Sequence, residues 1–251
     1  MALAGVPCVI CEPARPIATL VYLHGGGYRL GSAQWSAGFG STLAHVADTR
    51  VVLVDYGLAP ENPFPAALHD AAAALDESRS RWPTPIAVGG DSAGGGLAAA
   101  LVVAALQAGI ATPAGLVLLS PWLDLTVSAA SYESRSTSDL LFSRAQAAEA
   151  AQLYLQGWDP RDPLVSPVFA EVEDFPPVVL FTSTGEVLLD DSITLTDHLA
   201  RSAGRVQANF VADVPHAWPA VSPGLPAATA ALQAIATFVA SIAAAAAGRR
   251  A

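Results

Sequence analysis

Short apolar segments alternate with longer alanine-rich segments along most of the chain. The apolar segments are rich in β-branched residues, as buried parallel strands are. The expected strands are Val6–Cys11, Thr19–Leu23, Val51–Val54, Ile86–Val88, Leu116–Leu119, Val178–Phe181 and Val206–Val211. The expected helices are Trp35–Val46, Ala66–Arg79, Ala93–Gln107, Asp190–Ser202 and Ala227–Ala246. This alternation predicts an α/β fold, with a mostly parallel, doubly wound sheet and helices on both faces.

The segment Asp124–Pro177 interrupts the alternation. It contains no clear strand and one expected helix, Ser143–Gln156. Long segments of this kind within compact domains are often functional, so we interpret residues 124–177 as a reduced, lid-like insertion. The length of 251 residues fits one α/β domain, and we expect residues 1–251 to form it.

The last expected helix is long and almost uncharged, features that it shares with membrane spans. However, its larger apolar side chains fall on one helical face, while alanine and small polar residues fill the rest. These larger residues are Leu232, Ile235, Phe238, Val239 and Ile242. The pattern predicts a helix packed against the sheet, and we expect no membrane span.

Charge and composition exclude several classes of function. The net charge of -10 would repel the phosphates of a nucleic acid, so we expect no nucleic-acid partner. The chain has no lysine, which rules out a Walker phosphate loop, a Schiff-base enzyme and a Ser-Lys hydrolase. Residues Met1 to Gly5 do not resemble a signal peptide, and we therefore expect a cytoplasmic protein.

Cys8 and Cys11 are the only two cysteines. On the expected strand Val6–Cys11 their side chains would face opposite sides of the sheet. A zinc site needs four ligands, and the sequence offers neither a second cysteine pair nor a suitably spaced histidine pair. We interpret both cysteines as structural and expect no metal and no cofactor.

The segment Gly90-Asp91-Ser92-Ala93-Gly94 has the Gly-x-Ser-x-Gly pattern, between an expected strand and an expected helix. In this context the pattern is typical of a sharp turn that lifts a nucleophilic serine above a sheet. The alternative is a small-residue turn that binds phosphate. The glycines Gly94-Gly95-Gly96 come too late after the strand for a dinucleotide fingerprint, which favours a nucleophilic Ser92.

A second glycine-rich segment, His24-Gly25-Gly26-Gly27, directly follows the strand Thr19–Leu23. Glycines allow several backbone N–H groups to point at one position, where they can stabilise an oxyanion. By itself the segment could be a flexible turn. Together with the serine motif, and in this order along the chain, it indicates an acyl-transfer enzyme.

His216 is the candidate general base. It lies in a loop after the expected strand Val206–Val211, and the carboxyl ends of strands carry the active groups of α/β sheets. We expect His24 to brace the glycine loop. The remaining histidines, which lie in expected helices, are His45, His69 and His198.

The acid that orients this base is expected between Ser92 and His216 along the chain. Glu186 follows the strand Val178–Phe181 and is our first choice. The alternative, Asp190, is expected to begin a helix together with Asp191, where the helix dipole favours carboxylates. Asp213 is a third candidate.

With these motifs the sequence resembles the bacterial hormone-sensitive-lipase family of carboxylesterases, which have the α/β-hydrolase fold. The likeness covers nearly the whole chain. It rests on His24-Gly25-Gly26-Gly27, Asp55-Tyr56-Gly57-Leu58-Ala59-Pro60-Glu61, Gly90-Asp91-Ser92-Ala93-Gly94, Ser120-Pro121-Trp122-Leu123-Asp124-Leu125 and Pro215-His216. The resemblance implies a nucleophile at Ser92, an acid at Glu186 and a base at His216. It also implies oxyanion donors at the amides of Gly26, Gly27 and Ala93, with His24, Gly25 and Asp91 in supporting positions.

The sequence departs from the family pattern at two places. Gly57 stands where the family usually has arginine, so we expect a structural charge pair to be absent. Similar proteins begin with a cap-forming helical segment and a further strand, both of which we expect to be missing here. Val6–Cys11 would then open the sheet with an unpaired edge. We therefore expect a homo-oligomer that buries surface near this strand or beside the catalytic gorge, with a monomer as the alternative.

The expected function is hydrolysis of small-molecule carboxylic esters with short to medium acyl groups, by a Ser-His-Glu triad. An amidase or a lactonase would use the same residues. Another alternative is a non-catalytic ligand-binding protein on this fold, as in the gibberellin receptor, which has lost the catalytic histidine. A third is an inactive, truncated product.

Overall fold

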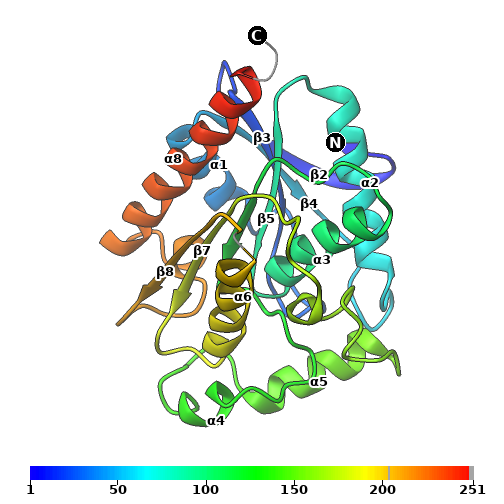
Figure 1. The fold of residues 1–251 in the computed structure, drawn as a ribbon, viewed down its shortest axis with the longest axis vertical. Coiled ribbons are helices and arrows are strands. Elements are labelled where there is room, and N and C mark those ends of the chain that lie inside the picture. The colour runs from blue at the N-terminus through cyan, green and yellow to red at the C-terminus, as the bar shows by residue number, and fades with distance from the viewer. Residues whose placement is uncertain (203, 249–251) are drawn as a thin grey trace.

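The computed structural model describes residues 1–202 and 204–248 and contains an eight-stranded sheet (Figure 1). The strand order is β1-β2-β4-β3-β5-β6-β7-β8. The strands are β1 (Ala2–Leu3), β2 (Val6–Cys11), β3 (Ala18–Leu23), β4 (Thr49–Val54), β5 (Ile86–Asp91), β6 (Leu116–Leu119), β7 (Val178–Ser183) and β8 (Val206–Val211). Strands β3 to β8 are parallel, whereas β1 and β2 pair antiparallel. The prediction of a mostly parallel sheet is therefore confirmed.

Helices cover both faces of this sheet, as predicted. Helices α2 (Ala66–Arg81), α3 (Ala93–Gln107) and α6 (Leu189–Arg201) pack on one face, and α1 (Ala37–Val46), α7 (Trp218–Val221) and α8 (Pro226–Gly248) on the other. Alternate strand residues supply the two cores. In β3, for example, Val21 and Leu23 face the first set of helices, and Leu20 and Tyr22 face the second.

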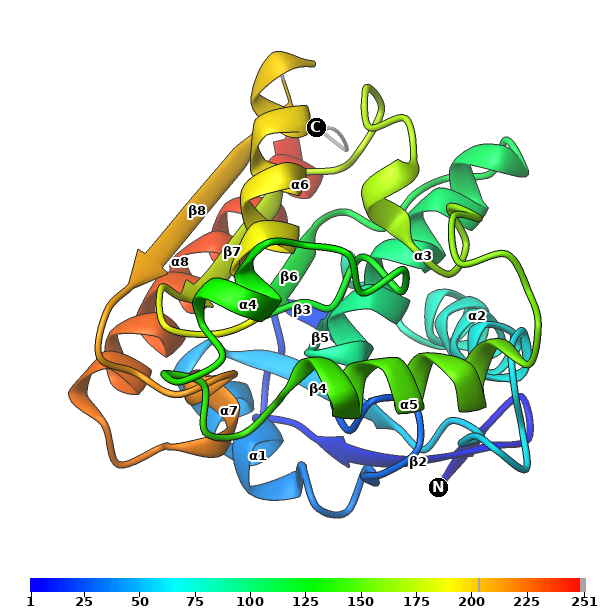
Figure 2. The ribbon, with the colours of Figure 1, turned by 90° about the horizontal axis from the view of Figure 1, so that it is seen from below.

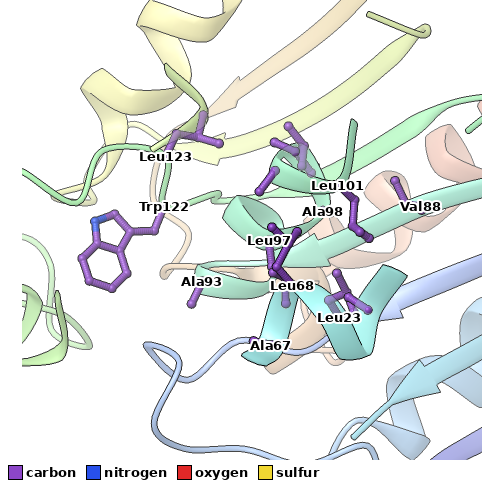
Figure 3. Close-up of a cluster of buried hydrophobic side chains, with 14 of the residues drawn as sticks. Leu23, Ala67, Leu68, Val88, Ala93, Leu97, Ala98, Leu101, Trp122 and Leu123 are labelled. Atoms are coloured by element: carbon purple, nitrogen blue, oxygen red, sulfur yellow. The ribbon is translucent and has the colours of Figure 1, made fainter. Parts of the chain in front are cut away.

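The contact between α3 and the central strands supports the turn at Ser92. Leu97 and Leu101 of α3 pack with Leu23 of β3, Val88 of β5 and Leu68 of α2 (Figure 3). Nearly all of α3 is buried, and its alanines and glycines allow it to lie close to the sheet. Burial of this apolar surface fixes the start of α3 relative to β5.

The insertion is more structured than predicted. The expected helix is present as α5 (Arg144–Leu155), with the Ser143 hydroxyl accepting the Gln146 N–H at 3.4 Å. The structure adds a four-residue helix, α4 (Ser131–Ser134), and a 3₁₀ helix at Pro167–Phe169. Figures 1 and 2 show α4 and α5 at the end of the molecule toward which β7 and β8 point.

The prediction that Val6–Cys11 opens the sheet is wrong. Strand β1, only two residues long, pairs antiparallel with the outer edge of β2 through Ala2–Pro7 and Leu3–Val6. The edge invoked for the expected homo-oligomer is thus already paired at that position. Cys8 and Cys11 are free thiols and pack into the cores on opposite faces, as expected for a strand.

Gly57 and helix α8 also bear on the sequence expectations. The Gly57 amide donates a hydrogen bond of 2.8 Å to Asp70, so the carboxylate there is bound by backbone. Helix α8 is long and apolar enough to cross a membrane by length and composition. Four of the five predicted residues on its apolar face are buried against the sheet side, and Phe238 is partly buried. The four are Leu232, Ile235, Val239 and Ile242.

Candidate active site

Ser92 occupies a sharp turn between β5 and α3. Its backbone has φ +52° and ψ -123°, a conformation that L-residues adopt only when the surrounding structure enforces it. A Cβ atom on Gly90 would collide with the backbone of Gly94, and one on Gly94 would collide with the carbonyl of Leu23. The glycines of the motif are therefore required for the close packing that lifts Ser92 out of the sheet.

A cavity of about 810 Å³ lies over this turn and brings together most of the residues that the sequence pointed to. Ser92, His216 and the loop His24–Gly27 all line it. The insertion contributes Leu141, Phe142 and Gln146 to its wall. Residues from four separate parts of the chain thus meet at the carboxyl end of the central strands, where α/β sheets hold their ligands.

Glu186 lies beside His216. The Nδ1 atom of His216 is 3.2 Å from the Oε2 atom of Glu186, which is almost completely buried in the loop after β7. Asp190 instead accepts the Ser131 N–H at 2.8 Å, and Asp213 is solvent-exposed. Of the three candidate acids, the structure thus brings Glu186 to the histidine.

The surroundings of His216 raise the pKa of its imidazole. Burial alone would lower the pKa of the imidazole, because it disfavours the charged form. The charge of Glu186 and its hydrogen bond act in the opposite direction, assisted by the charges of Asp139 and Asp91. The net result is a pKa raised above the usual 6.5 of histidine.

Three backbone amides are free to receive an anion near Ser92. Within the described part of the chain, the N–H groups of Gly26, Gly27 and Ala93 donate no hydrogen bond. Gly26 has φ +124° and Gly27 has φ +62°, conformations that glycine adopts readily. Gly26 and Gly27 line the cavity, and Ala93 directly follows Ser92 in the first turn of α3. Unpaired backbone amides of this kind are able to bind an anion.

The supporting residues tie the glycine loop to the serine turn. Asp91 is buried and accepts a hydrogen bond of 2.7 Å from the Tyr22 hydroxyl. Desolvation raises its pKa despite that hydrogen bond. A Cβ atom on Gly25 would collide with the Asp91 carboxylate, so these two segments touch directly. The His24 ring stacks on Tyr56 at 4.4 Å, and the Tyr56 hydroxyl donates to the His24 carbonyl at 2.6 Å.

Helix α5 supports the same loop from the other side, a role that sequence patterns did not reveal. The Tyr28 ring stacks on Tyr154 of α5 with centroids 3.9 Å apart. Arg29 forms an ion pair of 2.9 Å with Glu149 of α5. The insertion therefore contacts the segment that follows the glycine loop, besides lining the cavity. The two aromatic residues were visible in the sequence. Their contact could not be predicted, because more than a hundred residues separate Tyr28 from Tyr154 along the chain.

Sequence reasoning also missed Ser120, which follows β6. Its hydroxyl donates to Glu186 Oε2 at 2.7 Å and accepts the Ala217 N–H at 2.9 Å. The serine lies in the segment Ser120–Leu125 that carried the family resemblance, although nothing in that pattern indicated its partners. Within residues 1–202 and 204–248, no three His, Cys, Asp or Glu side chains are placed to hold a metal ion.

Comparisons with known proteins agree with this architecture. Residues 20–220 match the profile of a family described as having the alpha/beta hydrolase fold. The chain is 36% identical to an acetyl-hydrolase of Streptomyces hygroscopicus, covering 91% of this chain and 77% of that protein. It is 30% identical to the carboxylesterase NlhH of Mycobacterium tuberculosis, covering 87% and 75%.

Solved structures of esterases and lipases have the same fold as this chain. A hormone-sensitive lipase from a metagenome library superposes with a TM-score of 0.93 at 34% identity, over 97% of this chain and 83% of the other. An esterase of the bacterial hormone-sensitive-lipase family superposes with a TM-score of 0.91 at 37% identity, over 95% and 82%.

Proposed function

Since this chain belongs to the α/β-hydrolase fold family, with the bacterial hormone-sensitive-lipase esterases, and is a carboxylic ester hydrolase, we propose that it works through a Ser92-His216-Glu186 triad. The observation that carries the proposal is the hydrogen bond between His216 and Glu186 at the cavity that also exposes Ser92. The strained backbone of Ser92 supports the same assignment, because such strain clusters at functional sites.

The proposed reaction has two steps. His216 takes the proton of the Ser92 hydroxyl while the serine oxygen attacks the ester carbonyl, and the amides of Gly26, Gly27 and Ala93 bind the oxyanion. His216 then protonates the departing alcohol, which leaves an acyl-enzyme. Water, activated by His216, attacks this ester and releases the acid and the free serine. Glu186 stabilises the imidazolium that forms in each step.

The cavity supports small, apolar ester substrates. Phe39 and Phe142 line it, and so do the exposed side chains of Leu30, Trp35 and Leu141. A volume of about 810 Å³ holds a short or medium acyl group together with an alcohol group. The acetyl-hydrolase name of the Streptomyces relative favours the short end of this range. We propose the surface beside this cavity, where Trp35 and Leu141 are exposed, as the contact surface of the expected homo-oligomer.

A series of p-nitrophenyl esters tests this substrate range. We expect kcat/KM to be highest between acetate and hexanoate and at least about tenfold lower for palmitate, a difference of about 1.4 kcal/mol in activation free energy. A longer chain would lie outside the cavity on the surface, where it buries little apolar area. Ser92→Ala measures the background hydrolysis. Fastest turnover of palmitate would contradict the proposal.

The pH dependence follows from the raised pKa of His216. The imidazole must be neutral to accept the serine proton, so activity should rise with pH. Because the pKa is raised, the midpoint of kcat/KM against pH should lie above 6.5, the usual value for histidine. The stabilising contact between protonated His216 and Glu186 has the opposite dependence: it is fully present below the unfolded pKa and is lost as pH rises through the folded one. A rate that is flat across this interval would argue against a histidine base.

A further inference from the structure

A single hydroxyl connects the proposed acid to the loop of the proposed base. Ser120 is completely buried at the end of β6 and donates its hydroxyl proton to Glu186 Oε2 at 2.7 Å. The same oxygen atom of Ser120 accepts the backbone N–H of Ala217 at 2.9 Å. Ala217 directly follows His216, so Ser120 bonds the carboxylate of Glu186 and the backbone next to His216. Ser120 does not itself line the cavity.

The two carboxylate oxygens of Glu186 differ in their surroundings. Oε2 lies within hydrogen-bond distance of both the Ser120 hydroxyl and His216 Nδ1, whereas Oε1 is buried without a partner in the described chain. No other described side chain donates to this carboxylate. The orientation of the carboxylate therefore depends on two hydrogen bonds to Oε2, one with His216 and one from Ser120.

The backbone at this point favours glycine, yet the residue is serine. Ser120 has φ +45° and Ala217 has φ +52°, both in the left-handed region. Glycine adopts this region without the steric cost that a Cβ atom brings. A glycine at position 120 would also lack the hydroxyl. The serine therefore provides a hydrogen-bonding group, although its Cβ atom makes the positive φ sterically unfavourable.

We infer that Ser120 is a positioning residue. It holds the Glu186 carboxylate and the His216 loop in the relative orientation that proton transfer requires. The inference rests on the proposed triad. As His216 becomes positively charged, the Ser120 hydroxyl keeps Oε2 directed at the Nδ1–H group. The fixed geometry removes the need for the carboxylate to reorient during each step, and such preorganisation lowers the activation barrier.

The variants Ser120→Ala and Ser120→Gly test this inference together. Both remove the hydroxyl, and both should lower kcat about 10- to 100-fold, the order expected when a hydrogen bond to a charged group is lost. KM should stay unchanged, because Ser120 does not line the cavity. The melting temperature should be higher for Ser120→Gly than for Ser120→Ala, because glycine relieves the positive φ. Activity and stability should therefore change independently.

Ser192→Ala is the matched control. Ser192 in α6 is a completely buried serine whose hydroxyl accepts a hydrogen bond of 2.6 Å from Thr182, without contact to Glu186 or His216. It should lower the melting temperature and leave kcat within about twofold of the wild type, since its hydroxyl acts on stability alone.

Wild-type kcat in both Ser120 variants would overturn the inference, as would activity that recovers in step with stability in Ser120→Gly. Loss of folding in both variants would also overturn it, because Ser120 would then be required for stability. The proposed triad is tested separately by Ser92→Ala. An inactive Ser92→Ala beside fully active Ser120 variants would leave the triad standing and remove only the role of Ser120.

Discussion

Ser92→Ala is expected to lower kcat for ester hydrolysis by about a million-fold, because removal of a triad nucleophile eliminates the covalent route. The fold should be retained. The change deletes one side-chain oxygen atom, and the packing of α3 rests on the buried apolar residues of the helix. Purified protein and a p-nitrophenyl ester measure the effect directly, with circular dichroism as the check on folding.

Ser36→Ala provides a matched control for that variant. Ser36 lines the same cavity and precedes α1, where its side chain makes no capping hydrogen bond. Its replacement should change kcat by less than about tenfold, because the Ser36 hydroxyl takes no part in the proposed reaction. A Ser92→Ala enzyme that retained a tenth of wild-type activity would remove Ser92 from the mechanism.

The second large effect is expected at the acid. Glu186→Gln should lower kcat by about ten-thousand-fold, because an amide cannot hold the imidazole in the tautomer that accepts the serine proton. The new amide would also face two donors, the Ser120 hydroxyl and the Nδ1 side of His216. Steady-state kinetics of the purified variant against the wild type measure this loss.

Asp190→Asn is the comparison for Glu186→Gln. Asp190 lies in the first turn of α6 and accepts the Ser131 N–H, away from the imidazole. It should cost less than about tenfold in kcat, with some loss of stability from the helix terminus. The reverse order of effects would show that the wrong carboxylate was assigned.

The long elements were predictable because their patterns are local. Buried parallel strands appear as short β-branched segments, and the alanine-rich segments Ala66–Arg79 and Ala93–Gln107 favour helices. The structure has these helices at Ala66–Arg81 and Ala93–Gln107. The two-residue strand Ala2–Leu3 is too short to leave a pattern, and its pairing with β2 depends on the tertiary structure. The four-residue helix Ser131–Ser134 is likewise too short to leave a pattern in the sequence.

The residues of the candidate site were predictable where they directly follow the end of a parallel strand. Ser92, Glu186 and His216 each follow a parallel strand, so their side chains reach one edge of the sheet. The roles of buried hydroxyls and carboxylates were not accessible in this way. Asp191, for example, accepts the amides of Leu123 and Asp124 at 2.7 and 2.9 Å, besides lying at a helix start. Desolvation raises its pKa well above the usual range, which no local pattern reveals.

Mass spectrometry of the enzyme after reaction with a serine-directed organophosphate tests the covalent role of Ser92 most directly. The reagent forms a stable adduct on the nucleophile that would otherwise carry the acyl group. We predict one adduct per chain, on the peptide that contains Ser92, appearing in step with the loss of esterase activity and absent from Ser92→Ala. An adduct on another residue, or full inhibition without modification of Ser92, would contradict the proposed mechanism.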